Sequence, residues 1–460
     1  MSKRFDHHMS DSDSLLWRIE SDPTLRSTIV NVLVLDHTPR WDDVLHAFDR
    51  AAKAIPRIRQ RVVTPPLHLG PPHWSFDEQF DLEYHLRHGR AAGRRTLDEA
   101  LDQVRAWSLA SFDRERPPWE FMLIEDLADG QAVGALKIHH AVTDGVGGMD
   151  LAMHLFDLTP ELTPVDSGEL EPLEVLGALD LVRRTVGHHA RQLGVFAKDG
   201  VSSVVRGAAE FAQHPVEEGE RLAENLASAY RTIAPAITPC SPLMRGRSLS
   251  RDLRTLDIAV DDMKRASKIA EGTLNDVFLA AITGGLRRYH DRHGIAVGEL
   301  RMMMPINVRE GGPSRGGNFF NPARMLMPIT IRDPQARIER VGAIVRAQRN
   351  EPGIGMTSTL ASVLNRLPGG LATAIFGAML KGSDFVASNV PGAPVPLWFA
   401  GARIERSYAF GPTSGAAANV TLLSHFDTCC IGVVTDRAAI PDPDAFLECL
   451  RAGFAEVLAI

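Results

Sequence analysis

Residues 132–148 read AVGALKIHHAVTDGVGG, an apolar run followed by two histidines, an acidic residue and several glycines. The apolar run predicts a strand that ends at the two histidines. Adjacent side chains on a strand point to opposite faces, so only one of His139 and His140 can face a given cleft. The pattern HHxxxDG therefore supplies one imidazole, one carboxylate at Asp144, and a glycine at Gly145 where the chain turns tightly or admits a ligand.

General-base catalysis is the chemistry that this motif favours. The unperturbed imidazole pKa of about 6.5 lies near working pH. The N-terminal amides of a helix that opens at Gly148 would favour developing negative charge. The alternative is that His139 and His140 have only a structural role. The chain has two other adjacent pairs, His7-His8 and His188-His189, and neither is followed by the Asp-Gly of the motif. A metal site would need a third ligand besides His140 and Asp144, and none stands at a familiar spacing, so we predict no metal.

Strand and helix patterns alternate on both sides of the motif, which predicts a mixed α/β protein. The predicted strands are Thr28–Asp36, Phe121–Asp126, Ala132–His140, Thr255–Val260, Arg301–Ile306, Met325–Ile331, Asp384–Val390, Asn419–His425 and Thr428–Thr435. The predicted helices are Trp41–Ile55, Gly148–Asp157, Thr273–Asp291, Gln335–Arg349 and Asp444–Ala459. Between about residues 160 and 241 only helical patterns appear. We therefore expect an N-terminal domain over 1–160, a helical crossover over 161–241 and a C-terminal domain over 242–460.

Composition excludes several classes of protein. The 460 residues are 44% hydrophobic and 23% charged, which is ordinary for a globular protein and not for a disordered or fibrous one. The net charge of −7 argues against a nucleic-acid-binding surface. Four cysteines without metal-type spacing fit a reducing compartment, and the N-terminus lacks the apolar segment of a secretory signal. The longest apolar run, about Leu371–Leu380, is too short to span a bilayer. We expect a cytoplasmic protein, with contact to a membrane or lipid-droplet surface left open.

Several short motifs accompany the histidine motif in a fixed order along the chain. They are RPPWE at 116–120, LNDVFLA at 274–280, PINVR at 305–309, a Gly-Asn pair at 317–318 and SNVPG at 388–392. HHAVTDG alone resembles the signature of the condensing acyltransferase superfamily, which includes chloramphenicol acetyltransferase and peptide-synthetase condensation domains. The ordered set covers nearly the whole chain and resembles the bacterial wax ester synthase/diacylglycerol acyltransferase family. The chain departs from that family's pattern at Pro118 and at Leu25–Thr28, the latter near a predicted substrate entrance.

The resemblance implies two chloramphenicol acetyltransferase-like domains with mixed sheets, and an active site in a channel between them. It also implies transfer of a long-chain acyl group from acyl-CoA to diacylglycerol, a long-chain alcohol or both, without a cofactor. His140 would be the base that takes the proton of the acceptor hydroxyl, with His139 in a secondary, orienting role. Asp144 would hold the loop, paired with Arg309, and Gly145 would leave room for the substrate.

Four further residues carry both a substrate-binding and a structural interpretation. Asn275 and Asn389 are candidate donors to a tetrahedral oxyanion, although either can instead cap a helix or a turn. Asp276 stands three residues after Thr273, a spacing that caps a helix start as readily as it serves a substrate. Trp119 follows two prolines and either packs against a turn or borders the substrate.

Three other functions stay open. Residues 312–316, GPSRG, match the GxSxG nucleophile elbow of esterases, but a proline precedes Ser314 and no helix start follows it, which disfavours a serine hydrolase. A condensing enzyme of the same fold that takes its donor from an acyl carrier protein is a second alternative. A catalytically silent lipid-binding paralogue is the third, and the intact HHxxxDG, NDVFLA and SNVPG segments argue against it.

Overall fold

Two large β-sheets form the centre of the computed structural model, which describes residues 9–65, 70–142, 145–165, 175–177, 180–181, 183–184, 238–307, 320–350, 365 and 369–460. The first has seven strands in the order β4 (Leu86–Arg90), β5 (Trp119–Glu125), β6 (Ala132–His139), β1 (Thr28–Leu35), β13 (Ala402–Phe410), β12 (Trp398–Phe399) and β7 (Phe156–Asp157). The second has six strands in the order β10 (Phe320–Pro328), β9 (Glu299–Asn307), β11 (Phe385–Val390), β14 (Ala418–His425), β15 (Thr428–Asp436) and β8 (Arg251–Ala259). A hairpin adds β2 (Gln60–Val63) and β3 (His73–Phe76).

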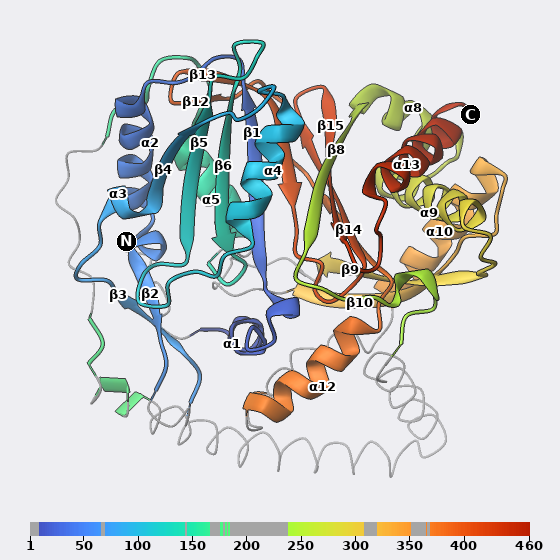
Figure 1. Ribbon diagram of the computed structural model, residues 1–460, viewed down its shortest axis with the longest axis horizontal. Coiled ribbons are helices and arrows are strands. Elements are labelled where there is room, and N and C mark those ends of the chain that lie inside the picture. The colour runs from blue at the N-terminus through green and yellow to red at the C-terminus, as the bar shows by residue number, and fades with distance from the viewer. Residues whose placement is uncertain are drawn as a thin grey trace, which may run out of the picture.

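The two sheets stand side by side and meet at the middle of the molecule (Figure 1). β13 joins the first sheet although it comes from the C-terminal part of the chain, and it pairs antiparallel with β1 so that Val30 lies opposite Phe410. Leu253 of the second sheet packs in one apolar cluster with Val32 and Tyr408 of the first. The two halves are therefore joined both by a C-terminal strand that pairs within the first sheet and by a common core.

Helices cover both faces of the first sheet. On one face, α2 (Trp41–Ala54) and α5 (Gly145–Leu155) pack on alternate residues of β1 and β5 such as Leu33 and Phe121. On the other face, α4 (Leu97–Ser108) packs on Val32 and its neighbours. The second sheet carries α8 (Val260–Ile269), α9 (Leu274–Arg292), α10 (Pro334–Arg349) and α13 (Pro443–Leu458).

A short N-terminal helix connects the two halves at their lower junction. α1 (Asp11–Ile19) begins at Ser10, whose side chain accepts a hydrogen bond from the N–H of Asp13. Its Leu15 and Ile19, one turn apart, are buried against Val386 of β11 and against α12 (Gly369–Lys381). The chain then passes through the 3-10 helix η1 (Pro23–Leu25) into β1. This segment places the end of α1 beside the start of β1, where the two histidines also lie.

Most predicted elements match the structure, and the differences have physical causes. All nine predicted strands are present with small shifts of their ends, and the helix predicted at Gln335–Arg349 is α10. The helix predicted at Gly148–Asp157 begins at Gly145 and ends at Leu155, because Phe156 and Asp157 pair with β12 instead. Several elements were not predicted, among them the strands β2, β3, β4, β7, β12 and β13 and the helices α1, α4, α8 and α12. The helical crossover falls almost wholly outside the described residues, and the boundaries at 160 and 242 stay a prediction.

Candidate active site

The imidazole of His139 is enclosed at the end of β6. Its side chain is fully buried, and the ring of Trp17 lies edge-on to it with the ring centres 4.8 Å apart. Nδ1 accepts a hydrogen bond from the N–H of Ala141 at 3.0 Å, and Nε2 lies 3.0 Å from Oε1 of Glu20. Because Nδ1 is an acceptor, the ring proton of a neutral His139 belongs on Nε2, facing the carboxylate. Both ring nitrogens are therefore engaged inside the protein.

Glu20 is the partner that sequence reasoning missed. It caps the C-terminal end of α1, and its Oε1 also accepts the N–H of Ser27 at 2.7 Å. Burial by itself raises the pKa of Glu20, but hydrogen bonds from His139 and Ser27 and the positive charge of Arg114 outweigh it and hold that pKa below its ordinary value. Glu20 is thus an ionised carboxylate inside the protein at neutral pH. An acidic residue at a helix end gives no such signal in the sequence.

His140 is the first residue after β6. Its backbone N–H donates to the carbonyl of Ser27 at 2.9 Å, and its side chain is half-buried. The neighbouring Thr28 pairs with His139 across β1 and β6. The carbonyls of Pro118 and Ser27 therefore hold the backbone N–H groups of His139 and His140, while Glu20 contacts the ring of the first.

Two residues of the loop between the histidines and α5, 143 and 144, fall outside the described residues. α5 begins at Gly145, whereas Asp144 is not described, and the same holds for Arg309 and Ser314. The predicted ion pair between Asp144 and Arg309 stays a prediction.

The structure brings the two predicted asparagines together. Asn275 is the second residue of α9, and Asn389 lies near the end of β11. Nδ2 of Asn389 donates to Oδ1 of Asn275 at 3.4 Å. Nδ2 of Asn275 is buried and makes no hydrogen bond within the described part of the chain. The pair therefore leaves one fixed amide donor uncommitted.

Asp276 caps the start of α9, as one of its two interpretations predicts. Its side chain accepts the N–H of Thr273 at 2.9 Å, and its own N–H donates to the Thr273 hydroxyl at 3.2 Å. Arg346 of α10 lies 3.8 Å from the same carboxylate. Asp276 also borders a cavity of about 400 Å³, which is lined by residues of α8, α9, α10 and the α8–α9 turn and by no residue of the first sheet.

Trp119 lies in the core of the first half and has no exposed face. It is 2% exposed, its indole N–H donates to the carbonyl of Ile58 at 2.7 Å, and it stacks between Phe48 and His85. This placement supports the packing interpretation of Trp119 over a substrate contact.

A second missed residue, Lys137, lies two residues before His139 on the same face of β6. It is fully buried, its Nζ lies 3.4 Å from Oε1 of Glu120, and it lies over the ring of Phe112 at 4.5 Å. Burial lowers the pKa of Lys137, and the attraction of Glu120 offsets only part of that effect. The face that carries His139 thus also carries a buried positive charge with a single carboxylate beside it.

We expect Glu20→Gln to lower the free energy of unfolding by about 2 kcal/mol at neutral pH, because hydrogen bonds to a charged group contribute about that much. The native pKa of Glu20 is lowered, so its stabilisation is present above the unfolded-state pKa of about 4.3 and is lost as the pH falls through the native value. Urea unfolding of both proteins at pH 7 and at a pH well below 4 measures this. The two stabilities should converge at the lower pH; a gap that stays constant would mean that the charge of Glu20 contributes nothing.

Comparison with protein families gives two matches that together span most of the chain. The wax ester synthase/diacylglycerol acyltransferase catalytic domain matches residues 9–278, and the WS/DGAT C-terminal domain matches residues 316–457. A putative diacylglycerol O-acyltransferase of Mycobacterium tuberculosis H37Rv is 36% identical over 459 residues, covering 100% of this chain and 93% of that protein. Another from the same strain is 29% identical over 440 residues, covering 91% and 89%.

Solved structures share the fold. The wax ester synthase/diacylglycerol acyltransferase from Marinobacter aquaeolei VT8 superposes with a TM-score of 0.65 at 22% identity, covering 98% of each chain. The first condensation domain of the calcium-dependent antibiotic synthetase gives a TM-score of 0.61 at 15% identity, covering 99% of this chain and 96% of that one. The predicted α/β fold with two chloramphenicol acetyltransferase-like lobes is confirmed by these likenesses.

Proposed function

The chain belongs to the wax ester synthase/diacylglycerol acyltransferase family, and on that premise we propose that it moves a long-chain acyl group from acyl-CoA to diacylglycerol, to a long-chain alcohol, or to both. Acyl transfer is the activity of the family; the donor and the residues that perform the transfer are our proposal. The products are triacylglycerol or wax ester, and free coenzyme A. One observation carries the assignment of the base: the ring of His139 is enclosed and engaged at both nitrogens, whereas His140 follows the strand end and is half-buried.

His140 acts as the general base. A base must come within hydrogen-bond distance of the acceptor hydroxyl, and a fully buried imidazole with both nitrogens engaged cannot do so. His139 instead positions the strand end, because Glu20 and Ala141 fix its ring while Ser27 accepts the backbone N–H of His140. Glu20, His139 and Ser27 are positioning residues in this scheme.

The reaction proceeds by direct attack. The imidazole of His140 takes the proton of the acceptor hydroxyl while its oxygen forms a bond to the thioester carbonyl carbon. The tetrahedral oxyanion then collapses, the carbon–sulfur bond breaks, and the thiolate of coenzyme A leaves. The imidazolium returns the proton to that thiolate, so no acyl-enzyme forms and His140 ends as it began.

Asn275 donates a hydrogen bond to the tetrahedral oxyanion. Asn389 donates to Oδ1 of Asn275 and so fixes which way that amide faces, which leaves Nδ2 of Asn275 as the donor. A fixed donor that is already desolvated stabilises an oxyanion without reorganising during the reaction. Asp276, which caps α9, holds the start of the helix that presents Asn275.

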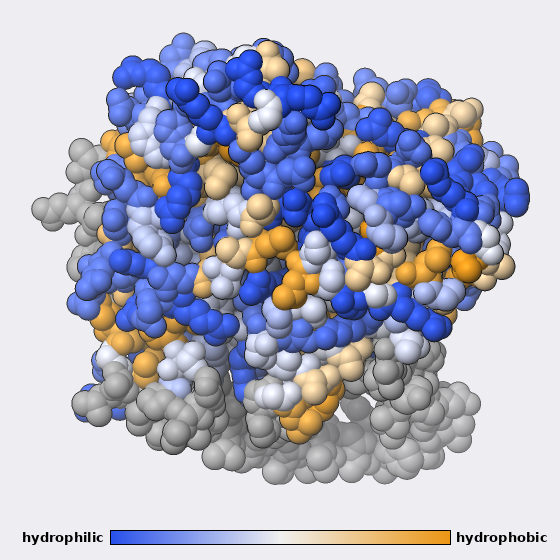
Figure 2. Space-filling view, viewed as in Figure 1, coloured by the Kyte–Doolittle hydropathy of each residue, from blue (hydrophilic) through white to orange (hydrophobic). Residues whose placement is uncertain are grey.

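The proposed acceptors do not dissolve in water, so we infer that the protein contacts a lipid surface at its periphery. We assign this contact to α12. No helix of the described residues is both long and apolar enough to cross a bilayer. α12 is short and apolar, and its Leu371 and Ile375, one turn apart, are 49% and 40% exposed. Apolar residues gather at the lower edge of the molecule in Figure 2, where α12 lies in Figure 1. Flotation with liposomes should recover the wild-type protein and recover less of a Leu371→Ser, Ile375→Ser double variant.

The test of the function is a product assay. Purified protein is incubated with radiolabelled oleoyl-CoA and either 1,2-dioleoylglycerol or hexadecanol, and the lipids are separated by thin-layer chromatography. We expect labelled triacylglycerol, wax ester or both. If oleoyl-CoA gives neither product but oleoyl-acyl carrier protein does, the donor is an acyl carrier protein thioester and not acyl-CoA. If neither donor gives a product, the proposed function is excluded.

A further inference from the structure

A second cavity, of about 180 Å³, lies between the two sheets on the side of α4. We call it the junction pocket, because residues of both halves line it. The first half contributes residues of the segment 23–30 and of the end of α4, and the second half contributes residues of the segments 249–253 and 410–413 and Val434. Nothing in the acyl-transfer mechanism above uses this pocket.

The junction pocket shares a wall with the proposed active site. Thr28 lines it and is the direct partner of His139 in the β1–β6 register. Directly opposite residues on antiparallel strands lie on the same face with their Cβ atoms about 5 Å apart. Ser27, between Arg26 and Thr28, holds Glu20 and the backbone of His140. A group bound at Arg26 therefore lies within a few residues of the site of chemistry.

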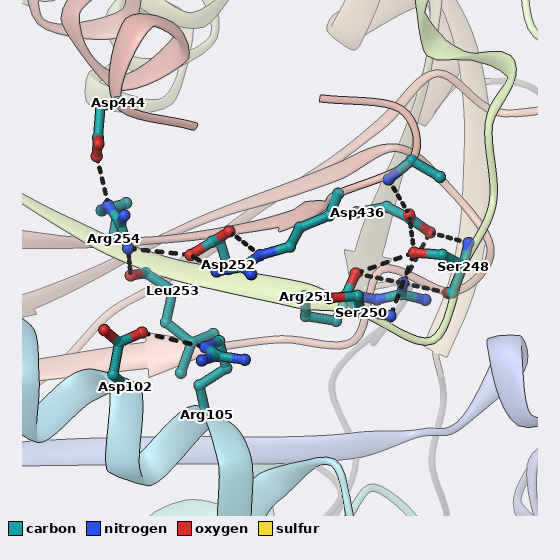
Figure 3. Close-up of polar contacts among 12 residues, drawn as sticks. Asp102, Arg105, Ser248, Ser250, Arg251, Asp252, Leu253, Arg254, Asp436 and Asp444 are labelled. Carbon is teal, nitrogen blue, oxygen red and sulfur yellow. Dashed lines mark hydrogen bonds and ion pairs between the residues drawn. The ribbon is translucent and has the colours of Figure 1, made fainter. Parts of the chain in front are cut away.

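Two guanidinium groups line the pocket, and they differ in whether a carboxylate pairs with them. Arg251 donates to the carboxylate of Asp436 at 2.7 Å and to the carbonyl of Ser250, as Figure 3 shows. Arg26 donates from Nη1 to the carbonyl of Leu109, and within the described part of the chain no carboxylate pairs with it. Arg26 is thus the positive group of the pocket that is free to meet an anion.

The other residues that line the junction pocket indicate which kind of anion fits it. The buried side chains of Val30, Leu253, Phe410 and Val434 give the pocket an apolar floor. Thr28 and Ser108 add hydroxyl groups near the guanidinium. A volume of 180 Å³ is about six times the share of one water molecule in the liquid and accommodates a phosphate group. Arginine binds phosphate oxygens in a planar, two-pronged geometry.

We infer that the junction pocket binds a phosphate group of a substrate through Arg26. The inference rests on the proposed function, and it concerns one subsite of it. The phosphate belongs either to the nucleotide end of the coenzyme A donor or to a phosphorylated glycerolipid, which would be an acceptor beyond the two classes proposed above. A free acyl thioester and an uncharged alcohol would leave the pocket empty.

The kinetic test compares two donors that differ in the phosphate-bearing portion. Arg26→Ala should lower kcat/KM for oleoyl-CoA about tenfold relative to oleoyl-N-acetylcysteamine, which lacks all phosphates, because a charge-assisted hydrogen bond is lost. Arg26→Lys should recover part of the difference, since it keeps the charge but not the two-pronged geometry. Arg105→Ala is the matched control, because Arg105 lies on α4 in an ion pair with Asp102 and does not line the pocket. Equal losses with both donors would exclude coenzyme A as the source of the phosphate and leave only the acceptor source, which the binding measurement below supports or overturns.

A binding measurement tests the inference independently of which substrates the enzyme converts. Calorimetric titrations of the full chain use adenosine 3′,5′-bisphosphate, for the coenzyme A source, and 1-oleoylglycerol 3-phosphate, for the acceptor source. We expect one of them to bind the wild type and to bind Arg26→Ala about tenfold more weakly, and the one that does so identifies the source. Binding of neither, or binding that Arg26→Ala leaves unchanged, overturns the inference. Failure of the proposed function appears separately, as a wild type without product in the chromatographic assay.

Discussion

His140→Ala should lose about 10²-fold or more of its turnover number with oleoyl-CoA and the better acceptor, while it keeps its fold. This is the span that removal of a general base costs, because no other group then takes the hydroxyl proton in the transition state. Turnover is measured by release of coenzyme A under saturating donor and acceptor. The KM for the donor should change little, since His140 meets the acceptor oxygen and not the nucleotide.

His139→Ala separates this prediction from a general disturbance of the strand end. His139 is buried against Trp17 and Glu20, so its removal should lower stability and reduce turnover less than His140→Ala does. Both variants are compared with the wild type by thermal unfolding. A fully folded His140→Ala enzyme with near-normal turnover would falsify the assignment of the base. A larger loss in His139→Ala than in His140→Ala, at equal stability, would transfer that role to His139.

Glu456→Gln should lower the free energy of unfolding by about 3 kcal/mol, the largest stability effect that we expect from a single substitution. One carboxylate on α13 serves three arginines on two other helices. Oε1 accepts from Arg287 at 2.8 Å and from Arg288 at 2.9 Å, and Oε2 accepts from Arg337 at 2.7 Å. Arg337 is fully buried, so loss of the charge leaves a guanidinium inside the protein without its counterion.

Glu448→Gln is the matched control on the same helix. Glu448 lies 3.4 Å from Arg292, and both side chains are more than half exposed, at 72% and 55%. An exposed pair of this kind contributes about 1 kcal/mol or less. Chemical unfolding of the wild type and both variants gives the two differences directly. Similar values for Glu448→Gln and Glu456→Gln would show that burial of Arg337 adds nothing to the cost.

Periodic patterns predicted nine strands and five helices that the structure contains, whereas local helices such as α4 and α8 were missed together with strands that pair distant segments. The helices α2, α9, α10 and α13 have apolar residues at helical spacing. Capping or proline residues mark the starts of the last three, and acidic residues stand in the first turn of α2. β13 also has a pattern, since Ala402, Ile404, Tyr408 and Phe410 alternate with polar residues and are buried. Its place beside β1 is set by tertiary packing, which no local pattern encodes.

Some residues of the candidate site could likewise be predicted from the sequence, and others could not. HHxxxDG identified the strand end and the two histidines, because the motif lies within one short segment. Glu20 could not be predicted, because a carboxylate at the end of an amphipathic helix is ordinarily solvated, and its burial depends on His139 more than a hundred residues later. Asp276 had two interpretations from sequence, and only the measured hydrogen bonds with Thr273 show the cap.

Direct transfer of the acyl group, without a covalent intermediate, is tested most directly by intact-protein mass spectrometry. The wild-type enzyme is mixed with excess oleoyl-CoA and no acceptor, quenched in acid, and weighed at times shorter and longer than one turnover. We expect the mass of the unmodified chain at every time point and labelled product only after 1,2-dioleoylglycerol or hexadecanol is added. A stoichiometric gain of one oleoyl group that is then passed to the added acceptor would contradict direct attack and establish an acyl-enzyme.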